Sequence, residues 1–193
     1  MSGWHEITGQ AVALAQDNID TDQLIPARFM SQPRADGYGD FLLHDVRGQG
    51  HPLDAGTVEV IVAGRNFGSG SSREAAVYAL VDFGVRAVFA PSFGDIFASN
   101  AVNNGLLPAR IDAETIAQLQ SVLAGGRAEA RVDLAAGTAV IAGQEVAFDL
   151  DPVWREKLMN GWDDIDLTAQ HDAEISEFAA ARVAAYPWAV PAT

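Results

Sequence analysis

The residues best able to do chemistry stand together in Gly64-Arg-Asn-Phe-Gly-Ser-Gly-Ser-Ser-Arg-Glu74, between an apolar run and a helical pattern. Gly68 and Gly70 flank Ser69 and allow the backbone to approach a ligand closely or to adopt a positive φ. The helix expected after this loop directs its unpaired N–H groups and the positive end of its dipole toward the loop. We therefore expect an anion to bind here.

The side chains of the same loop suit a carboxylate ligand. Arg65 and Arg73 bracket the loop and could each bind a carboxylate through two parallel hydrogen bonds, while Ser71 and Ser72 offer hydroxyls. A P-loop, a dinucleotide fingerprint and a nucleophile elbow are all excluded, because the lysine or the glycines that they require are missing. Ser71-Ser-Arg-Glu74 also matches a capping box, in which Ser71 would only begin a helix. Spacing alone favours that structural interpretation.

Several segments, in order along the chain, resemble the small subunits of 3-isopropylmalate dehydratase, which correspond to the swivelling domain of aconitase. The resemblance runs from about Ile7 to Gln170. Its segments are Asn18-Ile-Asp-Thr-Asp-Gln-Leu-Ile-Pro-Ala-Arg28, Arg65 to Glu74, Ala90-Pro-Ser-Phe-Gly-Asp-Ile-Phe97, Asn104-Gly-Leu-Leu-Pro108 and Asn160 to Thr168.

This resemblance implies a hydro-lyase subunit that isomerises 2-isopropylmalate to 3-isopropylmalate by dehydration and rehydration in leucine biosynthesis. A large subunit, in a heterodimer or heterotetramer, would carry a [4Fe–4S] cluster. Ser71 would be the base that removes the proton next to a carboxylate, Arg73 would clamp a carboxylate, and Asp22 would order the polar network. The remaining expected substrate-binding residues are Ser72, Arg65, Arg28, Ser69 and Gly70. A serine acts as a base only where N–H donors and cations stabilise its alkoxide.

The chain departs from the common family pattern at four positions of this segment. Ser69 and Ala75 stand where a cysteine and a histidine are usual, and Val77-Tyr78 replaces Pro-Trp. Two alternatives therefore stay open. One is a related 2-hydroxy diacid substrate, of the citraconate/methylmalate or homoaconitate type, and the other is a non-catalytic binding or regulatory module of the same fold.

Composition limits the partners and cofactors. The 193 residues include 12 basic and 26 acidic side chains, for a net charge of −14, which disfavours nucleic acid and anionic membranes as partners. The chain has no cysteine, so it offers no thiolate for iron, and its histidines show no metal-ligand spacing. We expect no metal or cofactor bound by this chain. No export signal or membrane span is evident, which predicts a cytoplasmic protein.

Alternating apolar strands and helical patterns predict an α/β domain with a mostly parallel central sheet and flanking helices. Expected strands cover 9–15, 57–63, 86–90 and 106–111, and expected helices cover 72–83, 92–103 and 114–124. A small antiparallel meander follows at 130–134, 139–142 and 146–150, and a helical extension begins at 152, with helices at 152–160 and 169–185. The resemblance implies one swivelling β/β/α-type domain over 1–193, with a long loop at 31–52.

Overall fold

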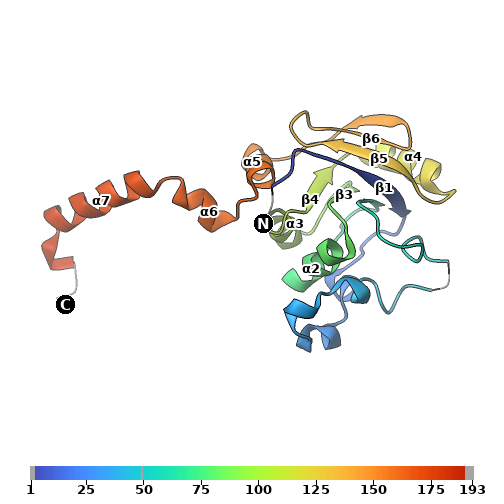
Figure 1. Ribbon diagram of the computed structural model, residues 1–193, viewed down its shortest axis with the longest axis horizontal. Helices are drawn as coiled ribbons and strands as arrows, with labels where there is room; N and C mark the ends of the chain where they lie inside the picture. The colour runs from blue at the N-terminus through green and yellow to red at the C-terminus, as the bar shows by residue number, and fades with distance from the viewer. Residues whose placement is uncertain (1–2, 49, 190–193) are drawn as a thin grey trace.

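Seven strands form one continuous sheet within residues 3–48 and 50–189, the part of the chain that the computed structural model describes (Figure 1). The ends of the expected 1–193 domain, and residue 49 of the expected loop, lie outside the described residues. The strand order is β4-β3-β2-β1-β5-β6-β7. The strands are β1 (Glu6–Leu14), β2 (Val60–Ala63), β3 (Ala87–Ala90), β4 (Leu107–Arg110), β5 (Ala128–Asp133), β6 (Thr138–Ile141) and β7 (Gln144–Ala147).

The parallel half of the sheet consists of β1 to β4. Strands β2 and β3 are buried at every position, as expected of parallel strands that are covered on both faces. Helix α2 (Glu74–Phe83) packs on one face, where Leu80 joins the same buried cluster as Ile61. Helix α4 (Ala113–Leu123) packs on the other face, where Leu119 lies with Val62. As predicted, Asp112 caps α4 by accepting from the N–H of Thr115.

The antiparallel half joins the parallel half through β1. The end of β1 pairs in parallel with β2, whereas its beginning pairs antiparallel with β5, in the register of Glu6 opposite Asp133. Strands β5, β6 and β7 continue as an antiparallel meander. The predicted α/β architecture is therefore confirmed, and the meander extends the central sheet.

The predicted loop at 31–52 folds into short turns beside α2. It follows α1 (Thr21–Leu24) and η1 (Ala27–Ser31), and contains η2 (Arg34–Asp36) and η3 (Gly39–Phe41). Tyr38 and Leu42 are buried, and Arg34 forms an ion pair with Asp82 of α2 at 2.7 Å. Its guanidinium also stacks over the ring of Tyr78, 4.4 Å from the centroid. These contacts fix the segment against the body of the protein.

The C-terminal helices leave the body of the protein. Helix α5 (Pro152–Asn160) lies against α3 (Asp95–Asn103), and α6 (Asp164–Ala169) and α7 (Asp172–Ala185) then extend outward toward η4 (Pro187–Ala189) (Figure 1). The helix predicted at 169–185 is found as α7, which begins three residues later, and α6 was not predicted. In the described ranges, no helix combines the length and apolar character that crossing a membrane requires.

Candidate active site

The loop between β2 and α2 is held on both sides by its neighbours. On one side, the N–H of Gly68 donates to the carbonyl of Ile19 at 2.7 Å, and the N–H of Thr21 donates to the carbonyl of Ser69 at 2.9 Å. On the other side, the N–H of Phe67 donates to the carbonyl of Ser92 at 3.1 Å. Because β1, β2 and β3 run parallel, their carboxyl ends bring these three segments together at one edge of the sheet, the usual place for a ligand in such folds.

Glycine is required where the loop meets the start of α3. Gly68 has a φ of +70°, and a Cβ there would lie 2.2 Å from Cγ of Phe97. A Cβ on Gly94 would lie 2.6 Å from the carbonyl oxygen of Gly68. The two backbones therefore touch without intervening side chains.

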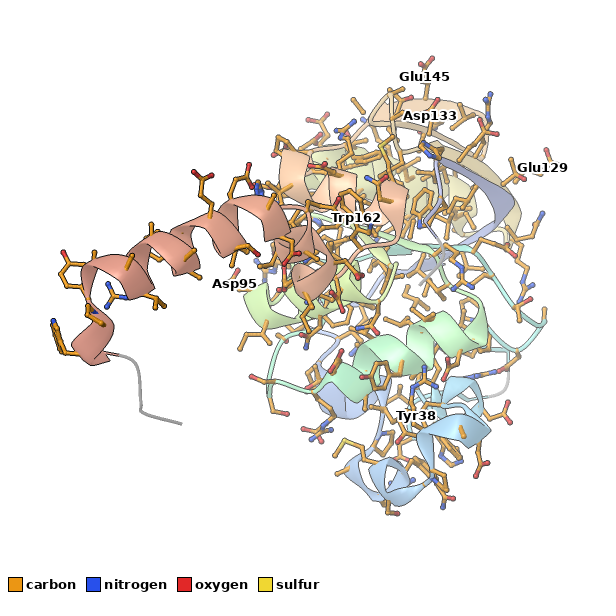
Figure 2. All side chains as sticks on the ribbon, turned by 60° about the vertical axis from the view of Figure 1, so that its left-hand side comes forward. Tyr38, Asp95, Glu129, Asp133, Glu145 and Trp162 are labelled. Carbon is orange, nitrogen blue, oxygen red and sulfur yellow. The ribbon has the colours of Figure 1, made fainter. Side chains whose placement is uncertain are left out.

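A pocket of about 210 Å³ opens at this contact. Asp95 stands at its rim, at the first residue of α3, and projects outward from the body (Figure 2). The pocket is lined by Gly68, Ser69, Gly70, Ser71, Gly94, Asp95, Ile96 and Phe97. Three predicted site residues, Ser69, Gly70 and Ser71, therefore share one small pocket.

Ser71 is exposed, and a buried threonine holds it. The hydroxyl of Thr21, a residue only 2% exposed, donates to the carbonyl of Ser71 at 3.0 Å. The same hydroxyl lies 3.4 Å from the Ser71 hydroxyl. Within the described part of the chain, no group accepts the N–H donors of residues 70–73. The loop thus presents a hydroxyl together with several unpaired backbone donors, which suits an anion.

The capping-box interpretation of Ser71 is wrong. Helix α2 begins at Glu74, its N-cap is Arg73 in an extended conformation, and no side chain caps it. The Glu74 carboxylate accepts from the side-chain amide of Asn104 at 2.9 Å instead of reaching back to Ser71. The positive φ of Gly70 turns the chain and places Ser71 three residues before the helix, so its hydroxyl is free for another role.

Arg73 lies beside Ser71 in a partly enclosed position. Its side chain is 14% exposed, and its Nη1 donates to Asp22 Oδ1 at 2.5 Å and to the carbonyl of Ile25 at 3.1 Å. Among the described residues, nothing accepts from its Nε or Nη2. The guanidinium is therefore fixed through one nitrogen and retains two donors for a carboxylate. Asp22, predicted to order the polar network of the site, is the acid that pairs with Arg73.

The other predicted arginines lie farther from the pocket lining. Arg65, with a side chain 70% exposed, pairs with Asp17 at 2.9 Å at the start of the loop. Arg28 pairs with Asp45, and its hydrogen bond is the main reason that the pKa of this carboxyl is lowered from 3.8 to about 2. The described partners of Arg28 thus lie in the 29–45 segment, and the structure does not bring it to the loop. Ser72 is exposed in the loop itself.

Sequence reasoning missed Thr21, the residue in closest contact with Ser71. Its only sequence signal was a position between two acids in the segment Asn18 to Arg28, and its burial could not be inferred from that pattern. It also missed Ser92, whose hydroxyl accepts from the N–H of Asn66 at 2.9 Å. At the unusual position Ala75, the side chain packs against the buried cluster under α2 and adds no polar atom to the site.

Metal-ligating side chains are not gathered at this site. In residues 3–48 and 50–189, no group of three or more His, Cys, Asp or Glu side chains is placed to hold a metal ion. The whole sequence also lacks cysteine. The residues present therefore do not fit an iron–sulfur cluster in this chain.

The comparisons with known proteins agree with this fold. Residues 45–114 match the family model of the aconitase C-terminal domain. The small subunit of 3-isopropylmalate dehydratase from Shewanella oneidensis is 43% identical and aligns with 89% of this chain and 92% of its own. The small subunit of 3-isopropylmalate dehydratase from Caulobacter vibrioides is 38% identical and aligns with 97% of this chain and 98% of its own. A crystal structure of 3-isopropylmalate dehydratase from Methanocaldococcus jannaschii superposes with a TM-score of 0.70 and 29% identity, covering 89% of this chain and 98% of that one.

The fold is that of the solved 3-isopropylmalate dehydratase structure, and part of the chain matches the aconitase C-terminal domain. More specifically, the chain belongs to the family of 3-isopropylmalate dehydratase small subunits.

Proposed function

We propose that this chain pairs with a large subunit and completes an active site that interconverts 2-isopropylmalate and 3-isopropylmalate. The observation that carries the proposal is the arrangement at the loop, where Ser71 and Arg73 both contact Thr21 and the N–H groups of 70–73 have no described acceptor. Since this chain does not suit a cluster, the [4Fe–4S] cluster would lie on the large subunit. Its iron would supply a Lewis acid for the departing hydroxyl.

The residues of this chain have defined tasks in that reaction. Arg73 binds a substrate carboxylate through Nε and Nη2, while Asp22 and the Ile25 carbonyl keep its Nη1 in place. Ser71, as its alkoxide, takes the proton from the carbon next to this carboxylate while the hydroxyl leaves the neighbouring carbon. Addition of water in the opposite sense returns the proton and gives the isomer. The N–H donors of the loop stabilise the alkoxide.

The remaining loop residues contribute to substrate binding. Gly70 keeps the backbone close to the ligand, and the hydroxyls of Ser69 and Ser72 are available for hydrogen bonds. Arg65, which is mostly exposed, is proposed to add positive charge at the mouth of the site. The proposal includes a cytoplasmic location and a single domain, with no nucleic acid or membrane as partner.

The test is turnover by the complex reconstituted from this chain and the large subunit of the same organism. Ser71→Ala should lower kcat by ~10²-fold or more, because it removes the proton acceptor. Arg73→Lys should lower kcat/KM by ~10-fold or more, because an ammonium cannot replace the forked guanidinium. Ser121→Ala, on the exposed side of α4, is the matched control.

Two results would contradict the proposal. If both site variants kept turnover within about twofold of the parent, the assigned roles would be wrong. If the active complex preferred a citraconate/methylmalate or homoaconitate-type substrate over 2-isopropylmalate, the substrate assignment would fail while the reaction class would stand.

A further inference from the structure

The segment formed by α6, α7 and η4, residues 164–189, is here called the arm. Every residue from 168 to 189 is exposed, and α7 has no buried residue along its 14 positions. Figure 1 shows the arm extending away from the sheet. An isolated helix of this length is only marginally stable in water. We therefore expect the arm to be stably helical only when it binds to another surface.

The arm carries large apolar side chains that the body does not cover. It holds six of the twelve large hydrophobic residues that are exposed in the described chain. At about 100° per residue, Ile175, Phe178 and Val183 fall within an arc of about 140° on α7, and Tyr186 continues this apolar stripe, in which Arg182 also lies. Trp188, in η4, is 83% exposed. Such a stripe is the usual signature of a helix that binds in an apolar groove.

The root of the arm is fixed to the same helix that borders the active site. Lys157, buried in α5, donates through Nζ to Asp164 of α6 and to the side-chain oxygen of Asn103, both at 2.5 Å. The Asn103 amide in turn donates to Asp164 at 3.1 Å. Asn103 is the last residue of α3, and Asp95, at the rim of the pocket, is the first.

The pocket at Asp95 and the root of the arm are close enough for one protein partner to cover both. With nine residues at 1.5 Å each, α3 spans about 13 Å. A protein that covers the pocket at Asp95 therefore also reaches the root of the arm. Exposed Ile96 and Ile165 lie near the two ends of this path, at 54% and 79% exposure.

The arm is predominantly acidic, which limits the surfaces that it can bind. Its acidic residues are Asp164, Asp166, Asp172, Glu174 and Glu177, against Arg182 as its basic residue. By helical spacing, Glu177 lies away from the apolar stripe of α7, and Glu174 lies at its border, one turn before Phe178. A complementary surface would be an apolar groove bordered by basic side chains.

We propose that the arm is the docking element for the large subunit, whose groove would receive the apolar stripe of α7. This inference rests on the proposed function, because that function supplies the partner. The active site needs a partner that closes over the pocket, and the arm begins one helix length away from it. A second copy of this chain is the competing occupant, although its acidic surface would repel the acidic arm.

The experiment measures the affinity of the full-length chain for the large subunit and the turnover of the complex. Ile175→Ser combined with Phe178→Ser should weaken association by ~10-fold or more, because a few large side chains contribute most of the binding energy at an interface. At saturating large subunit, kcat should stay within about twofold of the parent, since the arm does not touch the reacting groups. Ala173→Ser combined with Ala184→Ser, on the opposite face of α7, is the matched control and should bind like the parent.

The outcomes separate this inference from the proposed function. If the parent pair is active and the stripe variant binds within about twofold of it, the docking role is wrong and the function stands. If the isolated parent chain forms a dimer in sedimentation experiments that the stripe variant cannot form, the occupant is a second copy and the docking role is again wrong. If the parent neither binds nor activates the large subunit, both proposals fail.

Discussion

Thr21→Val is the substitution that best tests how the site is held together. The side chains have nearly the same shape, so the change removes the hydroxyl that donates to the Ser71 carbonyl without opening a cavity. A neutral hydrogen bond of this kind contributes a net ~1 kcal/mol to stability. For a chain of this size, that loss corresponds to a melting temperature lower by roughly 2–4 °C.

The expected effect on catalysis is larger than the effect on stability. Without the Thr21 hydroxyl, Ser71 loses both its carbonyl anchor and the neighbour 3.4 Å from its own hydroxyl. A displacement of about 1 Å at a reacting group can cost up to ~10²-fold in rate, so we expect kcat to fall by ~10-fold or more. KM should change little, because Asp22 and the Ile25 carbonyl still fix Arg73.

The assay is steady-state turnover of the reconstituted complex, together with thermal unfolding of the isolated chain. Thr21→Ser is the control, because it retains the hydroxyl and removes a methyl group from a buried position. It should lower the melting temperature by a similar amount and leave kcat near the parent value. If Thr21→Val kept kcat within about twofold, or if Thr21→Ser lost as much as Thr21→Val, Thr21 would not position Ser71.

Three further predictions concern packing and charge. Gly68→Ala should destabilise the chain by ~1–3 kcal/mol in chemical denaturation, because of its positive φ and the adjacent ring, whereas Gly125→Ala, which meets open space, should not. Asp164→Ala should cost ~1–3 kcal/mol, because it leaves the ammonium of Lys157, 3% exposed, without its carboxylate. Lys157→Met should lower the stability by less than Asp164→Ala does, because the Asp164 carboxylate left behind is 67% exposed and stays hydrated. A larger loss for Lys157→Met would show that the buried charge of Lys157 is not what makes Asp164 important. Hydrogen bonds from Lys157 and then Asn103 lower the pKa of Asp164 below 3.8, so its stabilisation of the arm root should be complete above pH 3.8. It should be lost as the pH falls through the lowered pKa, which hydrogen exchange of α6 would detect.

Much of the fold could be predicted because the apolar pattern is regular. Residues 57–63, 86–90 and 106–111 are short apolar runs separated by helical patterns, and each contains a strand of the parallel half. The helix at 152–160 matches α5, because Asp151 and Pro152 give it a clear beginning. The apolar pattern and the residues at helix ends therefore predict those strands and helices whose formation depends mainly on their own local sequence.

The elements that depend on tertiary contacts were harder to predict. The segment at 31–52 has the composition of a loop, yet buried Tyr38 and the pair of Arg34 with Asp82 fix it against α2. Helix α6 is short, and its first residue is bound to a lysine seven positions earlier in the chain. Such contacts leave no periodic signal in the sequence.

In the candidate site too, residue types predict some features, whereas others depend on tertiary contacts. The glycine-rich loop and Arg73 could be found from residue types, because close backbone approach and a forked cation are chemical requirements. That the Ser71 hydroxyl does not cap α2 could not be predicted, since the sequence matches a capping box and only the actual start of α2 at Glu74 excludes it. Thr21 is 50 residues from Ser71 along the chain. Its contact depends on the parallel pairing of β1 and β2.

The pairing of the loop arginines predicts that this chain on its own binds a dicarboxylate weakly. Arg65 is held by Asp17, and Arg73 is held by Asp22, so both arginines of the loop already face an acid. In water, a dianionic substrate gains little from such partly neutralised cations in a chain of net charge −14. A partner that closes over the pocket excludes water and strengthens the remaining interactions of Arg73 and of the loop N–H groups. The isolated chain should therefore bind 2-isopropylmalate at least ~10-fold more weakly in calorimetry than the complex does. Equal affinities would show that the loop alone provides the binding energy.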